Sequence, residues 1–216
     1  MTTSEAFRKH IESLARSYFD EEMSPAHDWF HVQRVRTNAE TLVANYPSAD
    51  ATVVYFGAVL HDIGRAKERQ GDVEDHAVWG ATESESLLRE HGTAADTSAA
   101  VAHCVRAHRY STEPEPETIE AKIVSDADDL DALGAVGLAR CFAHGGEVGS
   151  PIHDPSLPPE ADDTVAGRTQ LTHLRRKILD IPNRMHTDVG RELADERATY
   201  VQQFIQQFEK ESSGAR

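Results

Sequence analysis

Hydrophobic residues recur along this chain at intervals of three and four positions, the spacing of one face of an α-helix. Ser4, Asp50 and Asp75 precede three of these periodic stretches, where their side chains can cap a helix, and Gly64 and Gly92 end two of them. Nothing strand-like alternates for long. The pattern predicts an all-α protein with helices over about 4–19, 28–46, 51–64, 75–91, 96–108, 118–125, 127–143, 164–180 and 187–210.

Two stretches stand out from this pattern. Residues 51–64, ATVVYFGAVLHDIG, are apolar on nearly all sides, which predicts a helix at the centre of the core. Residues 144–163, HGGEVGSPIHDPSLPPEADD, are rich in Gly and Pro and too long for a simple connection, which favours a lid or a binding loop. Because the chain has 216 residues and no internal repeat, we expect one domain over residues 1–216.

The composition narrows the classes of partner and compartment. A formal net charge of -15 argues against general binding to nucleic acid, which needs a basic face. No run of about 18 apolar residues suggests a membrane span, and the N-terminal MTTSEAFRKH lacks the apolar segment of a secretory signal. Cys104 and Cys141 have no metal-type spacing, so we interpret them as buried thiols of a reduced compartment and expect a cytoplasmic protein.

The chemistry begins with His61 and Asp62, an adjacent pair at the end of the most apolar helix. Ionisable side chains in such a place cost several kcal/mol unless they are paired or bound to metal, and this pair alone leaves both explanations open. His31 on the preceding helix and the acidic run 126–131 in an otherwise apolar helix favour a metal. Together they form a mixed nitrogen and oxygen site, which suits Mn, Fe, Ni, Co, Zn or Mg.

Three segments, HDWFHVQRV, AVLHDIG and SDADDLDALGAVGLAR, occur in the order of the H…HD…D signature. They resemble the HD-domain superfamily of metal-dependent phosphohydrolases. FAHGGEVGSPIHDP, THLRRKILDI and MHTDVGRELADERATYVQQFIQQF resemble a subgroup of small HD proteins that includes nucleotide pyrophosphohydrolase-like members, so the resemblance covers nearly the whole chain. It implies a single-domain HD helical bundle that binds one divalent metal ion through His31, His61, Asp62 and Asp128.

The same resemblance implies hydrolysis of a nucleotide phosphate ester or anhydride through a metal-activated water, with manganese among the expected metals. Asp62 would be a ligand and also the candidate acceptor of the water proton. His76 and His108 would be further catalytic residues that face the phosphate as donors or acids. The resemblance carries Asp128 over through the A-D-x-L pattern, with further aspartates on either side of it.

Four other residues are candidates for binding the phosphorylated small molecule. Arg34 and Arg65 follow the predicted ligands closely in sequence, and their guanidinium groups suit phosphate oxygens. His173 and Lys177 are spaced i,i+4 in a helix that also resembles the subgroup, and they would approach the substrate under the 144–163 loop. A surface or structural role is the alternative for each of the four.

Several alternatives stay open at this stage. His76 and His108 would hold a second metal if the protein resembles binuclear HD proteins. A diiron oxygenase would require that second metal, because some HD-fold proteins are oxygenases, whereas a metal-stabilised regulatory or binding module would bind without turnover. The sequence decides neither the exact substrate, nor whether phosphate or pyrophosphate leaves, nor whether the chain forms a homo-oligomer.

Overall fold

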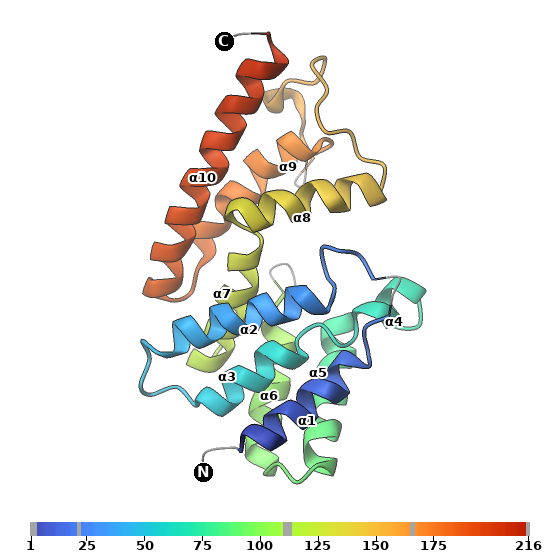
Figure 1. Ribbon diagram of the computed structural model, residues 1–216, viewed down its shortest axis with the longest axis vertical. Helices are drawn as coiled ribbons and strands as arrows, with labels where there is room; N and C mark the ends of the chain where they lie inside the picture. The colour runs from blue at the N-terminus through green and yellow to red at the C-terminus, as the bar shows by residue number, and fades with distance from the viewer. Residues whose placement is uncertain (1–3, 21–22, 110–113, 165–166, 215–216) are drawn as a thin grey trace. The chain divides into compact units, whose positions relative to one another are not determined.

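The computed structural model describes residues 4–20, 23–109, 114–164 and 167–214, which Figure 1 draws as a ribbon. Every regular element in this described part is helical, so the predicted all-α class is confirmed. The chain divides into two compact units, one of residues 1–23 and 27–128 and one of residues 24–26 and 129–216. The predicted single domain stays a prediction.

The first unit is built around the apolar helix. It contains α1 (Glu5–Arg16), α2 (Trp29–Val43), α3 (Ala51–Leu60), α4 (Arg65–Gln70), α5 (His76–Glu90), α6 (Ala95–Ala107) and most of α7 (Ile119–Asp131). Helix α3 packs against α2 and α6, and α5 packs against α6. Residues 53–60 of α3 are all buried, as its apolar pattern predicts. A Cβ at Gly57 would lie 2.9 Å from a Val124 methyl group and 3.0 Å from the Cβ of Cys104, so glycine allows the close approach.

The second unit contains α8 (Gly134–Glu147), the 3-10 helix η1 (Pro159–Ala161), α9 (Gln170–Arg176), the 3-10 helix η2 (Ile178–Arg184) and α10 (Asp188–Ser212). Helix α10 packs against α8 and η2. The ring centroids of Phe142 on α8 and Phe204 on α10 lie 5.7 Å apart, within the range of favourable aromatic pairs.

The helix starts predicted from Ser4, Asp50 and Asp75 are close to the observed ones because these side chains cap the helices. The Asp50 carboxylate accepts a hydrogen bond from the Thr52 amide at 2.8 Å, and the Asp75 carboxylate accepts one from the Ala77 amide at 2.8 Å. Gly92, just after α5, has a φ of 87°, the left-handed conformation expected of a glycine that ends a helix. Local capping chemistry therefore locates these boundaries from sequence alone.

The predicted end of the third helix at residue 64 is wrong, and the difference matters for the site. Helix α3 ends at Leu60, residues 61–64 form a turn, and the short polar helix α4 follows, which the apolar pattern could not reveal. The predicted break near residue 126 is also wrong, because α7 continues to Asp131. The break comes at residues 132–133, and α8 begins at Gly134, whose φ of 67° suits glycine.

Two boundaries in the second unit also differ from the prediction. Helix α8 continues to Glu147, so the loop predicted from residue 144 begins later and contains η1. The helix predicted over 164–180 is instead α9 followed by η2. The Thr169 side chain caps α9 by accepting a hydrogen bond from the Thr172 amide at 3.2 Å.

Cys104 and Cys141 are buried free thiols, and burial raises the pKa of each to about 12. Both therefore stay protonated at neutral pH and behave as small apolar side chains. Among the described residues, none of the helices is long and apolar enough to cross a membrane.

Candidate metal centre

His61 and Asp62 lie in the turn that follows α3, and both are buried, with exposed fractions of 0% and 1%. Two residues further on, Gly64 touches the main chain at the start of α5. A Cβ at Gly64 would lie 2.4 Å from the carbonyl oxygen of His76, which leaves no room for a side chain. This close approach brings the start of α5, and with it His76, next to Asp62.

The four residues predicted to bind one metal meet at this turn. His31 of α2 and His61 face each other through their Nε2 atoms, 3.2 Å apart. An oxygen of Asp128 from α7 lies 3.3 Å from the Nε2 of His31 and 4.0 Å from that of His61. The Oδ2 of Asp62 lies 3.7 Å and 3.6 Å from the same two nitrogens. The four side chains therefore present their donor atoms to one another.

The acidic run on α7 divides at Asp128. Asp128 reaches the histidines, whereas the next aspartate, Asp129, pairs with Arg184 at 3.4 Å. Asp131 accepts a hydrogen bond from Arg140 at 3.0 Å. Of these three carboxylates, the structure places Asp128 in the cluster and gives the other two arginine partners.

His76 and His108 approach the other oxygen of Asp62. The Nε2 atoms of His76, at the start of α5, and His108, after α6, lie 3.2 Å and 3.5 Å from the Oδ1 of Asp62. The Nδ1 of His108 lies 2.6 Å from the carbonyl oxygen of Val105, and the Nδ1 of His76 lies 2.9 Å from the Glu68 carboxylate. Because both partners accept, each Nδ1 carries the proton. A ring that is protonated on Nδ1 alone presents an Nε2 lone pair toward Asp62.

Three polar atoms at the centre of the cluster are buried without a hydrogen-bond partner: the Oδ2 of Asp62 and the Nε2 atoms of His76 and His108. A buried acceptor without a donor typically costs about 1–3 kcal/mol. Acceptors that face one another are the arrangement that a cation would stabilise. The residues present therefore fit divalent cations, in one group of His31, His61, Asp62 and Asp128 and a second group of Asp62, His76 and His108.

The pKa values agree with this donor chemistry. Burial lowers the pKa of His61 to about 4, so its ring is neutral at pH 7. Burial alone would raise the pKa of both carboxyl groups, but Arg65 lowers that of Asp62 and a hydrogen bond from His31 lowers that of Asp128, each well below its usual range. Neutral imidazole and ionised carboxylate are the protonation states that bind metal.

His27 also belongs to the cluster, and the sequence analysis missed it. Its Nδ1 lies 3.4 Å from the Oδ2 of Asp62, and its side chain is 29% exposed while the His31 and His61 side chains are fully buried. His27 is therefore the histidine of the cluster that solvent reaches most easily. The spacing of His27 and His31, four residues apart in HDWFH, is the sequence signal that could have identified it.

The predicted substrate-binding residues have different surroundings. Arg65 donates from its Nε to the Oδ1 of Asp62 at 3.0 Å, so its guanidinium already neutralises that carboxylate. Arg34 is half-buried on α2, one turn after His31. His173 and Lys177 are in the second unit, on α9 and at its C-terminal cap. Their approach to the substrate stays a prediction.

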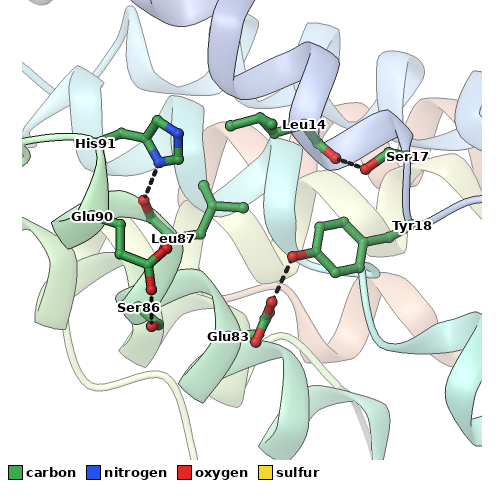
Figure 2. Close-up of a pocket in the computed structure, with 8 residues that line it drawn as sticks. All are labelled: Leu14, Ser17, Tyr18, Glu83, Ser86, Leu87, Glu90 and His91. Carbon is green, nitrogen blue, oxygen red and sulfur yellow. Dashed lines mark hydrogen bonds between the residues drawn. The ribbon is translucent and has the colours of Figure 1, made fainter.

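A surface groove of about 230 Å³ in the first unit offers a different environment (Figure 2). Its polar side chains bond to neighbours within the groove. The Tyr18 hydroxyl donates to Glu83 at 2.5 Å, the Ser86 hydroxyl donates to Glu90 at 3.0 Å, and the Nδ1 of His91 donates to a main-chain carbonyl at 2.8 Å. The lining contains two glutamates and neither Lys nor Arg, which disfavours a phosphate ligand.

Comparisons with known proteins extend these observations. Residues 29–133 match the HD-domain family, a range that contains both donor groups. YpgQ of Bacillus subtilis is 31% identical over 210 residues, which are 95% of this chain and 94% of YpgQ. The crystal structure of YpgQ in complex with ADP has a TM-score of 0.73 to this chain at 29% identity, and the match covers 94% of this chain and 97% of that one.

Two further relatives differ in how much of the chain they match. An HD-superfamily hydrolase from Bacillus thuringiensis has a TM-score of 0.76 at 30% identity, with 98% of this chain and 99% of that chain covered. The 3'-5' exoribonuclease YhaM of Bacillus pumilus is 31% identical over 117 residues, which are 48% of this chain and 37% of YhaM. The match to the HD-superfamily hydrolase thus covers nearly the whole chain, whereas the match to the exoribonuclease covers about half of it.

Proposed function

Since this chain belongs to the HD-domain superfamily, as its motifs predicted, we propose that it is a metal-dependent phosphohydrolase acting on a nucleotide. The observation that carries the proposal is the buried cluster around Asp62, where histidine nitrogens and carboxylate oxygens face one another and three of these atoms have no hydrogen-bond partner. Such a cluster is costly for a fold and suits divalent cations.

In this proposal His31, His61, Asp62 and Asp128 hold one divalent cation, with manganese among the suitable metals. The Nε2 lone pairs of His76 and His108 favour a second cation, shared through Asp62, over the role of proton donor to a phosphate. A bound divalent cation supplies positive charge that lowers the pKa of water from 15.7 toward about 7 and neutralises a phosphoryl oxygen.

The side chains around the cations have separate roles in the proposal. Asp62 is ionised at neutral pH and is the candidate acceptor of the water proton. Arg65 keeps that carboxylate ionised and is placed to exchange its contact with Asp62 for a phosphate oxygen. Arg34, His173 and Lys177 remain candidates for holding the substrate, and half-exposed His27 is a further candidate at the solvent side.

The ADP in the YpgQ structure supports a nucleotide as the ligand, because YpgQ matches nearly the whole chain. The partial likeness to YhaM makes the phosphodiester of RNA a second candidate substrate. The net charge of -15 favours the small nucleotide. The buried free thiols support the expectation of a cytoplasmic protein.

A panel of nucleoside mono-, di- and triphosphates together with a short RNA oligonucleotide, each incubated with Mn²⁺ and with chelator, tests the proposal. We expect hydrolysis of at least one mononucleotide that depends on added metal, and identification of the product as phosphate or pyrophosphate names the bond that is cleaved. Asp62→Ala, prepared in the same way, controls for contaminating phosphatases.

Cleavage of the RNA oligonucleotide and of none of the mononucleotides would favour RNA as the substrate. Metal binding without turnover of any substrate would favour a regulatory module. Two irons per chain together with oxygen consumption would favour the oxygenase. A protein that binds none of the divalent metals would overturn the proposal altogether.

A further inference from the structure

His76 is held differently from His61 and His108, two other histidines of the cluster. His61 and His108 donate from Nδ1 to the main-chain carbonyls of Ala58 and Val105, three residues back in the same segment. These hydrogen bonds require only the local backbone conformation of each segment. His76 instead donates to a side chain eight residues away, the carboxylate of Glu68 on α4. Its orientation therefore depends on one additional residue.

Glu68 contacts His76 through both of its oxygens. One oxygen lies 2.9 Å from the Nδ1 of His76, and the other accepts a hydrogen bond from the main-chain amide of the same residue at 3.3 Å. A two-point contact fixes both the ring and the backbone at the start of α5. The exposed fraction of the Glu68 side chain is 25%, whereas His76 is completely buried, so the carboxylate lies between solvent and the cluster.

Arg109 fixes Glu68 in turn. Its Nη1 lies 3.3 Å from Glu68 and 3.0 Å from Asp75, the residue that caps α5. Glu68, Asp75 and His76 could by themselves be taken for a metal site, since their donor atoms lie close together. The Arg109 guanidinium already supplies the positive charge between the two carboxylates. This arrangement favours a structural ion-pair network over a further bound cation.

We propose that Glu68 is a positioning residue that holds His76 in the tautomer protonated on Nδ1 and so directs its Nε2 lone pair toward Asp62 and a cation bound there. Without an acceptor at residue 68, the His76 proton is free to move to Nε2. In that tautomer the ring presents a proton, not a lone pair, to the cation. Arg109 and Asp75 keep the carboxylate in place, and Gly64 keeps the turn close enough for the contact.

Three substitutions separate this role from a general effect of charge. Glu68→Met removes the acceptor at similar length, and Glu68→Gln removes the charge but keeps an oxygen that accepts from Nδ1. If Glu68 acts only through its ion pair with Arg109, the two variants should behave alike. Glu83→Met is the matched control, because Glu83 is a half-buried glutamate on α5 that holds Tyr18.

Long-range ¹H–¹⁵N correlation spectra of the metal-free protein at pH 7.5 report the tautomer of each histidine directly. We expect the Nδ1–H tautomer of His76 in the wild type, in Glu68→Gln and in Glu83→Met, and substantial Nε2–H tautomer in Glu68→Met. His61 and His108 should keep their tautomers in all four proteins and serve as internal references. A wild-type His76 protonated on Nε2 would overturn the proposal without any variant, even if Glu68→Met failed to fold.

Mn²⁺ titration by calorimetry provides the second readout. We expect Glu68→Met to weaken binding of the ion that contacts His76 by roughly 10- to 100-fold, the usual effect of removing a residue that orients a ligand. Glu68→Gln should recover most of the loss. Equal affinities for Glu68→Met and the wild type would refute the positioning role. The inference rests on the proposed function only for the identity of the site, since tautomer and affinity are measured without substrate and can hold in a protein that hydrolyses no nucleotide.

Discussion

Two of the places where polar side chains gather in the first unit are the groove between α1 and α5 and the cluster around Asp62. In the groove, the hydroxyl of Tyr18 and the carboxylate of Glu83 bond to each other, and Ser86 and Glu90 do the same (Figure 2). In the cluster, Asp62 and two of the histidines that face it keep buried atoms without a partner. The cluster, and not the groove, therefore has unmet binding capacity for a ligand.

The physical difference lies in solvent access as well as in partners. The polar residues of the groove keep contact with water, which can satisfy any polar atom that loses its partner. His61 and Asp62 have almost no exposed surface, so an unpaired atom there keeps its full desolvation cost. A hollow on the surface is thus weaker evidence for function than a buried group of acceptors facing one another.

The largest effect is expected from Asp62→Ala, because this carboxylate faces both donor groups. Turnover of the nucleotide identified by the panel should fall by at least the roughly 10²–10³-fold that follows removal of one charge-stabilising group. Mn²⁺ binding should be lost while the helical circular dichroism spectrum is retained, and His61→Ala should behave in the same way. Wild-type turnover by either variant would place the site elsewhere, and the groove would then become the next candidate.

Asp128 and its neighbour sharpen the assignment within the acidic run. Asp128→Ala should weaken Mn²⁺ binding by more than the roughly 10- to 100-fold typical of residues that only orient a ligand, because its oxygen lies 3.3 Å from His31. Asp129→Ala should leave the affinity unchanged, because that carboxylate pairs with Arg184. Calorimetric titration of both variants measures the contrast, and the reverse order would show that the register on α7 is wrong.

A smaller effect concerns the pH dependence of the metal-free protein. Burial lowers the pKa of His61 from 6.5 to about 4, so the unfolded chain binds this proton at a higher pH than the folded chain does. The free energy of unfolding should therefore be highest above pH 6.5 and should fall as the pH drops from 6.5 toward 4. His61 alone should contribute a loss of a few kcal/mol.

Urea denaturation at a series of pH values measures this dependence, with His61→Gln as the reference. The variant should show a shallower decline than the wild type between pH 6.5 and 4. Parallel curves for the two proteins would mean that His61 is not buried in its neutral form.

The smallest effect is expected in the groove. Tyr18→Phe removes a hydrogen bond to a half-exposed glutamate and should lower the free energy of unfolding by about 1 kcal/mol. Turnover and Mn²⁺ affinity should equal those of the wild type, because no groove residue contacts the cluster through the bonds described. A loss of turnover in this variant, with stability unchanged, would contradict the comparison on which the site assignment depends.

Much of the first unit follows from local patterns in the sequence. The apolar run of α3 predicts a buried central helix, and the caps at Asp50 and Asp75 predict where two helices begin. The motifs also selected the four residues that meet at the turn after α3. The apolar run and the caps depend on contacts within three or four residues, which the sequence displays directly, whereas the four residues were selected through the family resemblance.

Other features of the site could not be predicted in this way. Glu68 lies in a polar stretch of sequence that is typical of an exposed helix, and nothing in the neighbouring sequence indicates that it contacts His76. Arg109 meets Glu68 across 41 positions of sequence. Such contacts depend on how α4, α5 and the end of α6 pack together, and no periodic pattern encodes that arrangement.

The sequence by itself determined the helical class of this protein and the burial of α3, and its motifs selected four of the side chains that meet near the end of that helix. Periodicity and capping are local features of the sequence. Ionisable residues in an apolar helix need a charged or metal partner, whichever part of the molecule supplies it. Only the tertiary structure decided which oxygen of Asp62 faces which histidines, that His27 joins them, and that Glu68 holds the ring of His76. These relations are distances between helices, and side-chain packing in the whole unit sets them.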